Sequence, residues 1–472
     1  MILLLGSLLS LPIGIIPEGL RCAAETTAAA VQNEDENAGK EVTDIKISGM
    51  IVTNGSQISY YLEEDGTVSI VGCGRDMTGK VEIPAVIEEK TVKKIAEGAF
   101  YNCETLERVI LPDSVTVIEP GAFHGCKKLS SVEIPDTVTE IGESAFYGCE
   151  ALTKLRFPEK ISVIPESCCS GCISLTEIQF PSSLRSIGKE AFYSVCGTEQ
   201  LEIPDGVTDI GEKAFYYWPR LKTVSFPASL SALGDFVFDG CDVLEAIQVS
   251  DENKSFCDEN GILYTKDMTK LIKYPPCQPA TEFIVPDSVK ELAAWSFIGA
   301  ENLRTISLSN VEKFGEDTFY YCTNLEAITI PEAMKEIPEA AFAYCHSLTN
   351  VVIPEDCTGI GAYAFLDCTG IRALTVPKSV EKIGEYAMGY GYDLESESLT
   401  ILEDFKLDVW RGSMGAAYAK ANELEYRSHS YLWLIFLIAG VVCGGIAAAA
   451  AIIHKKQSEI HVSSWNPRQK SS

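Results

Sequence analysis

Apolar and polar residues alternate in short stretches along the middle of this 472-residue chain, and most of the stretches end at a proline. In residues 129–135, "LSSVEIP", Val132 and Ile134 lie on one face of a predicted strand, because successive side chains of a strand point to opposite faces. Pro135 has no amide hydrogen to donate and therefore ends the strand. The pattern predicts a short, half-buried strand, followed by a turn at "DTVTEIGESAFYGC".

This unit recurs every 23 residues over much of the chain. An apolar residue followed by Pro marks it at Ile83-Pro84, Leu111-Pro112, Ile134-Pro135, Phe157-Pro158, Phe180-Pro181, Ile203-Pro204 and Phe226-Pro227. The series resumes at Val285-Pro286, Leu308-Ser309, Ile330-Pro331, Ile353-Pro354 and Val376-Pro377. One unit cannot bury its own apolar side chains, whereas stacked units can. The period therefore predicts a β-rich solenoid with one parallel strand per coil.

The repeated unit resembles that of the BspA-like surface proteins, a leucine-rich repeat subclass whose unit reads roughly LxxIxIPxxVxxIGxxAFxxC. The resemblance covers about Val81 to Leu402. It includes twelve positions equivalent to the Phe of that unit: Phe100, Phe123, Phe146, Cys169, Phe192, Phe215, Phe238, Phe297, Phe319, Phe342, Phe365 and Met388. It implies a leucine-rich repeat fold and a bacterial or protist surface protein that adheres to host proteins or to other cells.

Two irregularities interrupt the array. Residues 167–172 read "SCCSGC" where Ala-Phe-x-x-Cys is expected, so that Cys169 replaces a ring and predicts a void in the stack. Between Ser250 and Pro286 the interval is 36 residues, and its sequence reads as two strands, Ile262–Thr265 and residues 270–274, around a polar turn. These strands predict an inserted β-hairpin at 251–280 that projects from the solenoid. The alternative is a hairpin that only patches a distorted coil.

The two ends differ from the repeats. Residues 2–16 are apolar and precede small residues at 22–24, an order typical of a signal peptide; an uncleaved membrane-associated end is the alternative. Residues 431–453 carry no charge and precede a basic flank, which is typical of a transmembrane helix; a buried core helix is the alternative. The chain divides into signal peptide 1–24, low-complexity linker 25–42, N-terminal β cap 43–80, solenoid 81–402, C-terminal cap and juxtamembrane segment 403–430, transmembrane helix 431–453 and cytoplasmic tail 454–472.

Charge and motif content exclude several functions. The formal net charge is −29, and such a surface repels nucleic acid, whose binding needs Lys and Arg to neutralise phosphates. The sequence has no HExxH, GxSxG or P-loop motif. His124 and His346 stand too many coils apart to share a metal or a substrate. We therefore expect a protein that is not an enzyme and has no cofactor, no metal site and no nucleic-acid partner.

The cysteines invite three interpretations: zinc ligands, disulfides or packing. Of 17 cysteines, a series occupies the last position of the repeat unit: Cys103, Cys126, Cys149, Cys172, Cys241, Cys322, Cys345 and Cys368, with Cys196 displaced by one residue. Thiols in such a column would stand about 4.8 Å apart and point the same way, which suits neither tetrahedral zinc nor a disulfide. Packing is therefore the prediction. The irregular cluster leaves room for one disulfide: Cys168, Cys169, Cys172 and Cys196.

A ladder of side chains should face outward along the strands, on a surface that repeat proteins commonly use for binding. It comprises Ile110, Glu133, Arg156, Gln179, Glu202, Ser225, Gln248, Ile284, Ser307, Thr329, Val352 and Thr375. No single chemistry runs along it, and the alternative is a merely solvated face. The candidate ligand contacts are Arg156, Gln179 and Gln248 on this ladder, and Tyr264 and Tyr274 on the hairpin, whose aromatic side chains a lone hairpin could not fully bury.

These patterns favour a non-catalytic, membrane-anchored protein of the cell surface, with an extracellular N-terminal ectodomain. Its solenoid would bind an extracellular protein or glycan, and one helix would embed it in the membrane. The alternative hypothesis is a receptor-like or structural surface component whose short cytoplasmic tail recruits an intracellular partner.

Overall fold

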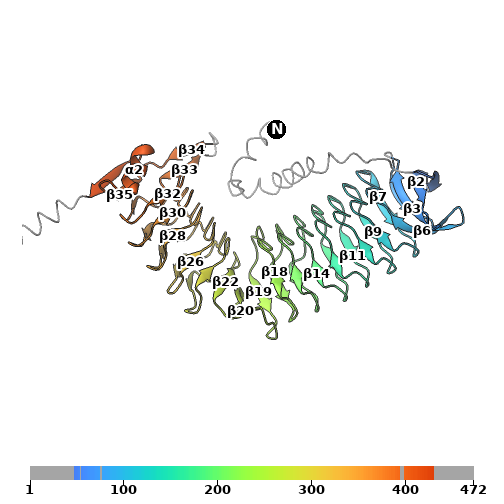
Figure 1. Ribbon diagram of the computed structural model, residues 1–472, viewed down its shortest axis with the longest axis horizontal. Helices are drawn as coiled ribbons and strands as arrows, with labels where there is room; N and C mark the ends of the chain where they lie inside the picture. The colour runs from blue at the N-terminus through green and yellow to red at the C-terminus, as the bar shows by residue number, and fades with distance from the viewer. Residues whose placement is uncertain (1–46, 54, 75–76, 394–397, 430–472) are drawn as a thin grey trace, which may run out of the picture.

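The computed structural model describes residues 47–53, 55–74, 77–393 and 398–429, which form a β-solenoid closed by a cap at each end. Figure 1 shows the coils side by side along a curved arc. The arc runs from the cap strands β2 (Ser56–Leu62) and β3 (Val68–Cys73) to helix α2 (Met414–Ala421). The predicted signal peptide, linker, transmembrane helix and cytoplasmic tail lie outside the described residues.

Each regular coil contains two short parallel strands, and the prediction of one strand per coil is wrong. The first strand stands just before the proline: β9 (Ser131–Glu133) pairs with β7 (Leu106–Ile110). The second is only two residues long: β10 (Glu140–Ile141) pairs with β8 (Val117–Ile118). A strand of two residues is too short to show alternation in the sequence, which is why the pattern did not predict it.

The strands form two columns, and neighbours within a column are parallel wherever they are hydrogen-bonded. The first column comprises β4 (Gly79–Glu82), β7, β9, β11 (Lys154–Arg156), β13 (Glu177–Gln179), β15 (Gln200–Glu202), β17 (Thr223–Phe226), β19 (Ala246–Val249), β23 (Glu282–Ile284), β25 (Thr305–Ser307), β27 (Ala327–Thr329), β29 (Asn350–Val352), β31 (Ala373–Thr375), β35 (Lys406–Trp410) and β36 (Tyr426–His429). The second comprises β6 (Lys90–Ile95), β8, β10, β12 (Val163–Ile164), β14 (Ser186–Ile187), β16 (Asp209–Ile210), β18 (Ala232–Leu233), β22 (Lys270–Lys273), β24 (Glu291–Leu292), β26 (Lys313–Phe314), β28 (Glu336–Ile337), β30 (Gly359–Ile360) and β32 (Lys382–Ile383).

The Ala-Phe pair forms the tight turn that returns the chain to the next coil. The ring of Phe123 stacks on those of Phe100 and Phe146, with centroids 5.1 and 5.4 Å apart. Residues with left-handed backbone flank each ring, as Ser144 (φ 53°) and Gly148 (φ 65°) flank Phe146. Repeating this turn places the rings in one buried column, as the period predicts.

The cysteine column combines packing with a hydrogen bond. The Cys126 thiol donates to the carbonyl oxygen of Phe100, with Sγ and oxygen 3.0 Å apart. The same contact, to the aromatic position 25 or 26 residues earlier, recurs at Cys149, Cys172, Cys241, Cys322, Cys345 and Cys368. Trp218, which replaces the cysteine of one coil, makes it with Nε1, 2.7 Å from the oxygen of Phe192. The side chains named here are buried, which confirms the packing prediction for them.

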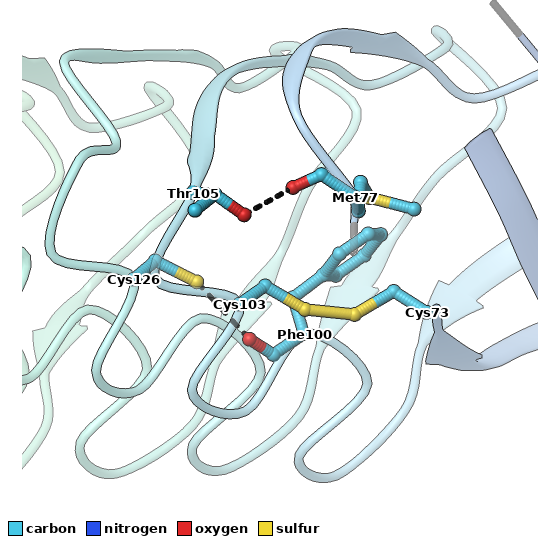
Figure 2. The surroundings of a disulfide bond; sticks show 6 residues. All are labelled: Cys73, Met77, Phe100, Cys103, Thr105 and Cys126. Carbon is cyan, nitrogen blue, oxygen red and sulfur yellow. Dashed lines mark hydrogen bonds between the residues drawn. A yellow bond between two sulfur atoms is a disulfide. The ribbon is translucent and has the colours of Figure 1, made fainter. Parts of the chain in front are cut away.

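The N-terminal cap is joined to the first coil by a disulfide between Cys73, at the end of β3, and Cys103 (Figure 2). The prediction that Cys103 is an unpaired packing thiol is therefore wrong, because this thiol faces the cap instead of a preceding coil. The disulfide predicted for the irregular cluster is also wrong. Its four cysteines are free, Cys172 keeps its hydrogen bond to Phe146, and the sulfur atoms of Cys168 and Cys169 stay 3.9 Å apart.

The ring that Cys169 lacks is replaced from the strand side. Phe157 and Phe180 stand where most coils have an aliphatic residue, and both lie edge-on to Phe192, with centroids 6.2 and 5.7 Å from it. Phe157 is fully buried, as are Cys168 and Cys169. The void that the sequence predicts is therefore compensated by larger side chains on the opposite side of the coil.

The insertion forms a three-stranded antiparallel meander of β20 (Phe256–Glu259), β21 (Ile262–Thr265) and β22. It does not project as predicted, because β22 pairs in parallel with β24 and so belongs to the second column. Tyr274 then takes the place of the repeat Phe: its ring stacks 4.8 Å from that of Phe297, and its N–H donates to the carbonyl oxygen of Ser296.

Buried polar side chains fasten the insertion to its neighbours. Asn253 donates from Nδ2 to the carbonyl oxygens of Pro227 and Leu230, at 2.8 and 2.9 Å. Lys273 forms a buried ion pair with Asp239 of the preceding coil. Because every one of these groups is satisfied, the insertion is an integral part of the stack.

The caps cover the two open ends of the solenoid. At the N-terminus, β1 (Gly49–Thr53), β2 and β3 form an antiparallel meander that continues into β6, beside which lies β5 (Val86–Ile87). At the other end, β33 (Tyr390–Asp393) and β34 (Ser398–Ile401) form a hairpin, and the Tyr418 hydroxyl of α2 donates to the carbonyl oxygen of Met388.

Candidate ligand-binding surface

The exposed ladder runs along the first column, on the side where the sequence places it. Arg156 and Gln179 are register partners on β11 and β13, and Gln248 pairs with Ser225 on β19 and β17. Arg156, Gln179 and Gln248 are exposed, and Arg156 forms an ion pair with Asp136 at 2.8 Å. The structure therefore brings Arg156 and Gln179 together and places Gln248 three strands beyond Gln179.

Strand pairing in this column stops between β13 and β15. A hollow of about 900 Å³ lies over this gap and over the neighbouring strand β17. We call it the β13–β15 hollow. It is lined by Thr176, Glu177, Ile178, Gln179, Phe180, Thr198, Gln200, Leu201, Glu202, Ile203, Pro204, Asp205, Ser225, Phe226, Pro227 and Ser250. Gln179 is the only candidate contact from the sequence that lines it.

A single departure from the repeat accounts for the gap. Thr198 stands where the neighbouring coils have the buried leucines Leu175 and Leu221. Its hydroxyl bonds to the backbone of Gln200, with Oγ1 3.0 Å from the carbonyl oxygen and 3.2 Å from the amide nitrogen. Threonine tends to make such local backbone bonds in place of packing, so the coil opens here. This substitution is the signal from which the hollow could have been found.

The hollow combines an apolar floor with a polar rim. Ile178 and Phe180 are only half-buried, although the equivalent Leu155 and Phe157 in the preceding coil are each 1% exposed. Gln179, Gln200 and the hydroxyl side chains form the rim. An apolar floor with a few polar groups around it is typical of ligand sites.

The charges of the hollow are negative. Its lining contains the carboxylates Glu177, Glu202 and Asp205, and no Lys or Arg. Glu177 is in an ion pair with Lys154 at 2.9 Å, in which both side chains are largely exposed. An arrangement of this kind suits a neutral or positively charged polar ligand and repels an anion.

The two tyrosines predicted as contacts on the hairpin are not available for contact. Tyr264 and Tyr274 are each 1% exposed, so that prediction is wrong. Burial raises the pKa of the Tyr274 hydroxyl to about 12. The reason is that Tyr274-Pro-Pro-Cys277 repeats the spacing of Phe-x-x-Cys, and Tyr274 stands 23 residues before Phe297. Counting back from Phe297 would have placed it in the core.

Metal and membrane features were also sought in the described residues. These residues contain no group of three or more His, Cys, Asp or Glu side chains placed to hold a metal ion. Within the same ranges, no helix combines the length and the apolar character needed to cross a membrane. The predicted span at 431–453 is outside them.

Known structures resemble this solenoid. The chain is similar to a leucine rich cell surface protein from Faecalibacterium prausnitzii, with 24% identity and a TM-score of 0.55, over 72% of this chain and 95% of the other. It is also similar to the pneumococcal vaccine antigen PcpA, with 21% identity and a TM-score of 0.58, over 82% and 100%. At these identities the likeness shows the fold alone.

Sequence comparison identifies the family. No curated protein matches the chain. The family model described as a BspA type leucine rich repeat region matches residues 80–195, 185–260 and 273–395, which is more than half of the chain. Together with the repeated turn, the aromatic column and the cysteine column, this match shows that the chain belongs to the BspA type leucine-rich repeat family.

Proposed function

We propose that this protein is a membrane-anchored, non-catalytic protein of the cell surface that binds an extracellular protein or glycan through the β13–β15 hollow. The observation that carries the proposal is the hollow itself, where a regular strand column opens over the half-buried Ile178 and Phe180. Buried surface in every other respect follows the repeat, so the opening is a local feature that packing does not require. Its negative rim favours a neutral or basic ligand.

Export is supported by two further observations. The disulfide between Cys73 and Cys103 requires an oxidising compartment to persist, as outside the cytosol. The apolar N-terminal residues 2–16 and the uncharged residues 431–453 have the order expected of a signal peptide and a C-terminal anchor. We expect truncation before Tyr431 to release a soluble, folded ectodomain into the medium. Retention of the truncated chain in the membrane fraction would contradict a single C-terminal span.

Binding can be tested with variants of the hollow. The purified ectodomain is first screened against extracellular matrix proteins and neutral glycans. Thr198→Leu restores the leucine of the repeat and should close the hollow, so we expect the captured ligand to be lost while the melting temperature stays equal or rises. Gln179→Arg with Ser225→Arg should weaken the same binding by crowding the rim.

The matched control places the same substitutions elsewhere on the ladder. Ser307→Arg with Thr329→Arg changes two register partners of β25 and β27, in coils that do not line the hollow. We expect this control to bind as the unmodified protein does. Equal binding by Thr198→Leu and the unmodified ectodomain would show that the hollow is not the site.

A further inference from the structure

A second hollow, of about 490 Å³, lies on the insertion and differs from the first in charge. Four lysines line it together with three hydroxyl residues and two acids: Lys254, Ser255, Thr265, Lys266, Asp267, Thr269, Lys270, Lys290 and Glu291. We call it the lysine hollow. The chain as a whole has a net charge of −29, so a site whose lining is positive is a local exception.

Two of the four lysines are already neutralised, and two are not. Lys270 forms an ion pair with Glu291 at 2.8 Å, and Lys290 forms one with Glu312 at 3.2 Å. Lys254 and Lys266 are exposed and have no ion pair with any carboxylate in the described ranges; Lys266 Nζ donates only to the carbonyl oxygen of Asp251. Two ammonium groups on one hollow are therefore available to an anion.

The acid between these lysines is occupied by its own turn. Asp267 Oδ1 accepts hydrogen bonds from the Thr265 hydroxyl at 2.7 Å and from the amide and hydroxyl of Thr269 at 3.1 and 2.9 Å. These bonds lower the pKa of the Asp267 carboxyl. The carboxylate shapes the β21–β22 turn and leaves both lysines without it as an ion-pair partner.

The backbone that carries the lysines is held in place. The amide of Lys266 donates to the carbonyl oxygen of Ser255 at 2.8 Å, and the amide of Lys290 donates to that of Thr269 at 2.8 Å. Buried Asn253 accepts from the amide of Ser255 at 2.8 Å, which fixes the segment next to Lys254. Only the lysine side chains must be ordered on binding, which lowers the entropic cost of association.

The lining also indicates the class of ligand. It contains ammonium and hydroxyl groups, and no aromatic or aliphatic residue that could hold an apolar side chain of a peptide. A long polyanion would be repelled by the net charge outside the hollow. We propose that the lysine hollow binds a single acidic sugar, whose carboxylate lies between Lys254 and Lys266 and whose hydroxyls face Ser255 and Thr269.

Binding of small glycosides to the purified ectodomain tests this proposal. The probes are the methyl glycoside of glucuronic acid, N-acetylneuraminic acid and, as the neutral match, methyl glucoside, each measured by calorimetry or by NMR at low salt. We expect both acidic sugars to bind, with an affinity that falls as salt rises, and methyl glucoside not to bind. Equal binding of methyl glucoside, or no binding of either acidic sugar, would overturn the proposal.

Charge variants locate the binding. Lys254→Ser with Lys266→Ser should weaken acidic-sugar binding at least tenfold, whereas Lys254→Arg with Lys266→Arg keeps both charges and should retain binding. Lys128→Ser with Lys160→Ser removes the same charge from exposed lysines of other coils and should change nothing. Equal losses in the two serine pairs would show a general charge effect and contradict the site.

The lysine hollow and the β13–β15 hollow can fail independently. Thr198→Leu should leave acidic-sugar binding unchanged, because Thr198 does not line the lysine hollow. Loss of acidic-sugar binding in Thr198→Leu would therefore place that ligand elsewhere and overturn the inference.

Discussion

At the scale of single residues, the chain uses small side chains for two purposes at once. The cysteine of each coil fills a space beside the aromatic column and also donates to a backbone carbonyl oxygen of the neighbouring coil, as Cys345 does to Phe319 at 3.2 Å. Alanine would fill less space and donate nothing. Burial raises the pKa of the thiols, to about 12 for Cys126 and Cys322, and thereby makes them unreactive while the protein is folded.

The thiol column can be checked by alkylation. In the native protein we expect the buried thiols of Cys126, Cys149, Cys322 and Cys345 to resist an alkylating reagent. In unfolded, unreduced protein they should all react, whereas Cys73 and Cys103 should react only after reduction. Mass spectrometry of the peptides measures each site. Pairs of these four cysteines joined between neighbouring coils would contradict the packing account.

His124 should make the fold sensitive to mild acid. Its ring stacks between Tyr101 and Tyr147, and burial lowers its pKa from 6.5 to about 4. Because the folded pKa is the lower one, the stabilising effect is complete above pH 6.5 and is lost as the pH falls towards 4. The free energy of unfolding should fall by about 2–3 kcal/mol over this window.

Urea unfolding at a series of pH values measures this effect. His124→Phe keeps a ring in the stack and cannot be protonated, so the fall between pH 6.5 and 4 should be smaller by that amount. If the pH profiles of the variant and of the unmodified protein ran parallel, buried His124 would not be the cause.

At the scale of the structural element, the coil is limited by how closely two backbones approach. A Cβ atom built on Gly211 would lie 2.5 Å from the amide nitrogen of Lys189 in the preceding coil. Similar contacts meet Gly142, Gly234, Gly315, Gly361 and Gly384. The glycine of the Ile-Gly pair is therefore required by the stacking of the coils, in addition to any turn that it makes.

Gly211→Ala should consequently destabilise the protein, by about 2–3 kcal/mol if the coils separate to accept the methyl group. Gly72→Ala is the matched control, because its Cβ would meet only the Ser59 side chain, at 3.7 Å. Thermal or urea unfolding of the two variants gives the comparison. An equal effect of both substitutions would show that close backbone approach is not what selects glycine at 211.

The period-23 pattern was sufficient to predict the solenoid, the aromatic column and the position of the insertion, because all three depend on residues that repeat. What it could not predict is the packing of exceptions. Two-residue strands have no readable alternation, and the ring missing at Cys169 is compensated by Phe157 and Phe180 from another part of the coil. The β13–β15 hollow follows from one side chain, Thr198, whose effect depends on a hydrogen bond within its own loop.

At the scale of the whole molecule, the core consists of two hydrophobic clusters that meet at the insertion. Alternate side chains of β21 belong to different clusters: Leu263 to the N-terminal one, and Ile262 and Tyr264 to the C-terminal one. The buried pair of Lys273 and Asp239 crosses the same junction. The insertion therefore joins two halves of the solenoid that each have a core of their own.

Weakening the junction should separate the unfolding of the two halves. Asp239→Asn leaves the Lys273 charge buried without its partner, which typically costs about 3–5 kcal/mol. We expect urea unfolding, followed by fluorescence, to change from one transition to two. Glu326→Gln, which breaks the exposed pair with Arg304, should alter stability by less than about 1 kcal/mol and keep one transition. A single unshifted transition in Asp239→Asn would contradict the role of the junction.

The spacing of the contacts also sets an order in which the chain can fold as it is synthesised. The hydrogen bond from Cys126 reaches back 26 residues, and the disulfide of the cap closes over a separation of 30. At typical synthesis rates one coil emerges in about 1–5 s, far longer than local structure needs to form, so each coil can add to a finished template. The insertion needs the longest wait, because Gln278 bonds to Glu245, 33 residues earlier. Folding from the N-terminus should therefore advance in even steps and pause once, where the two halves meet.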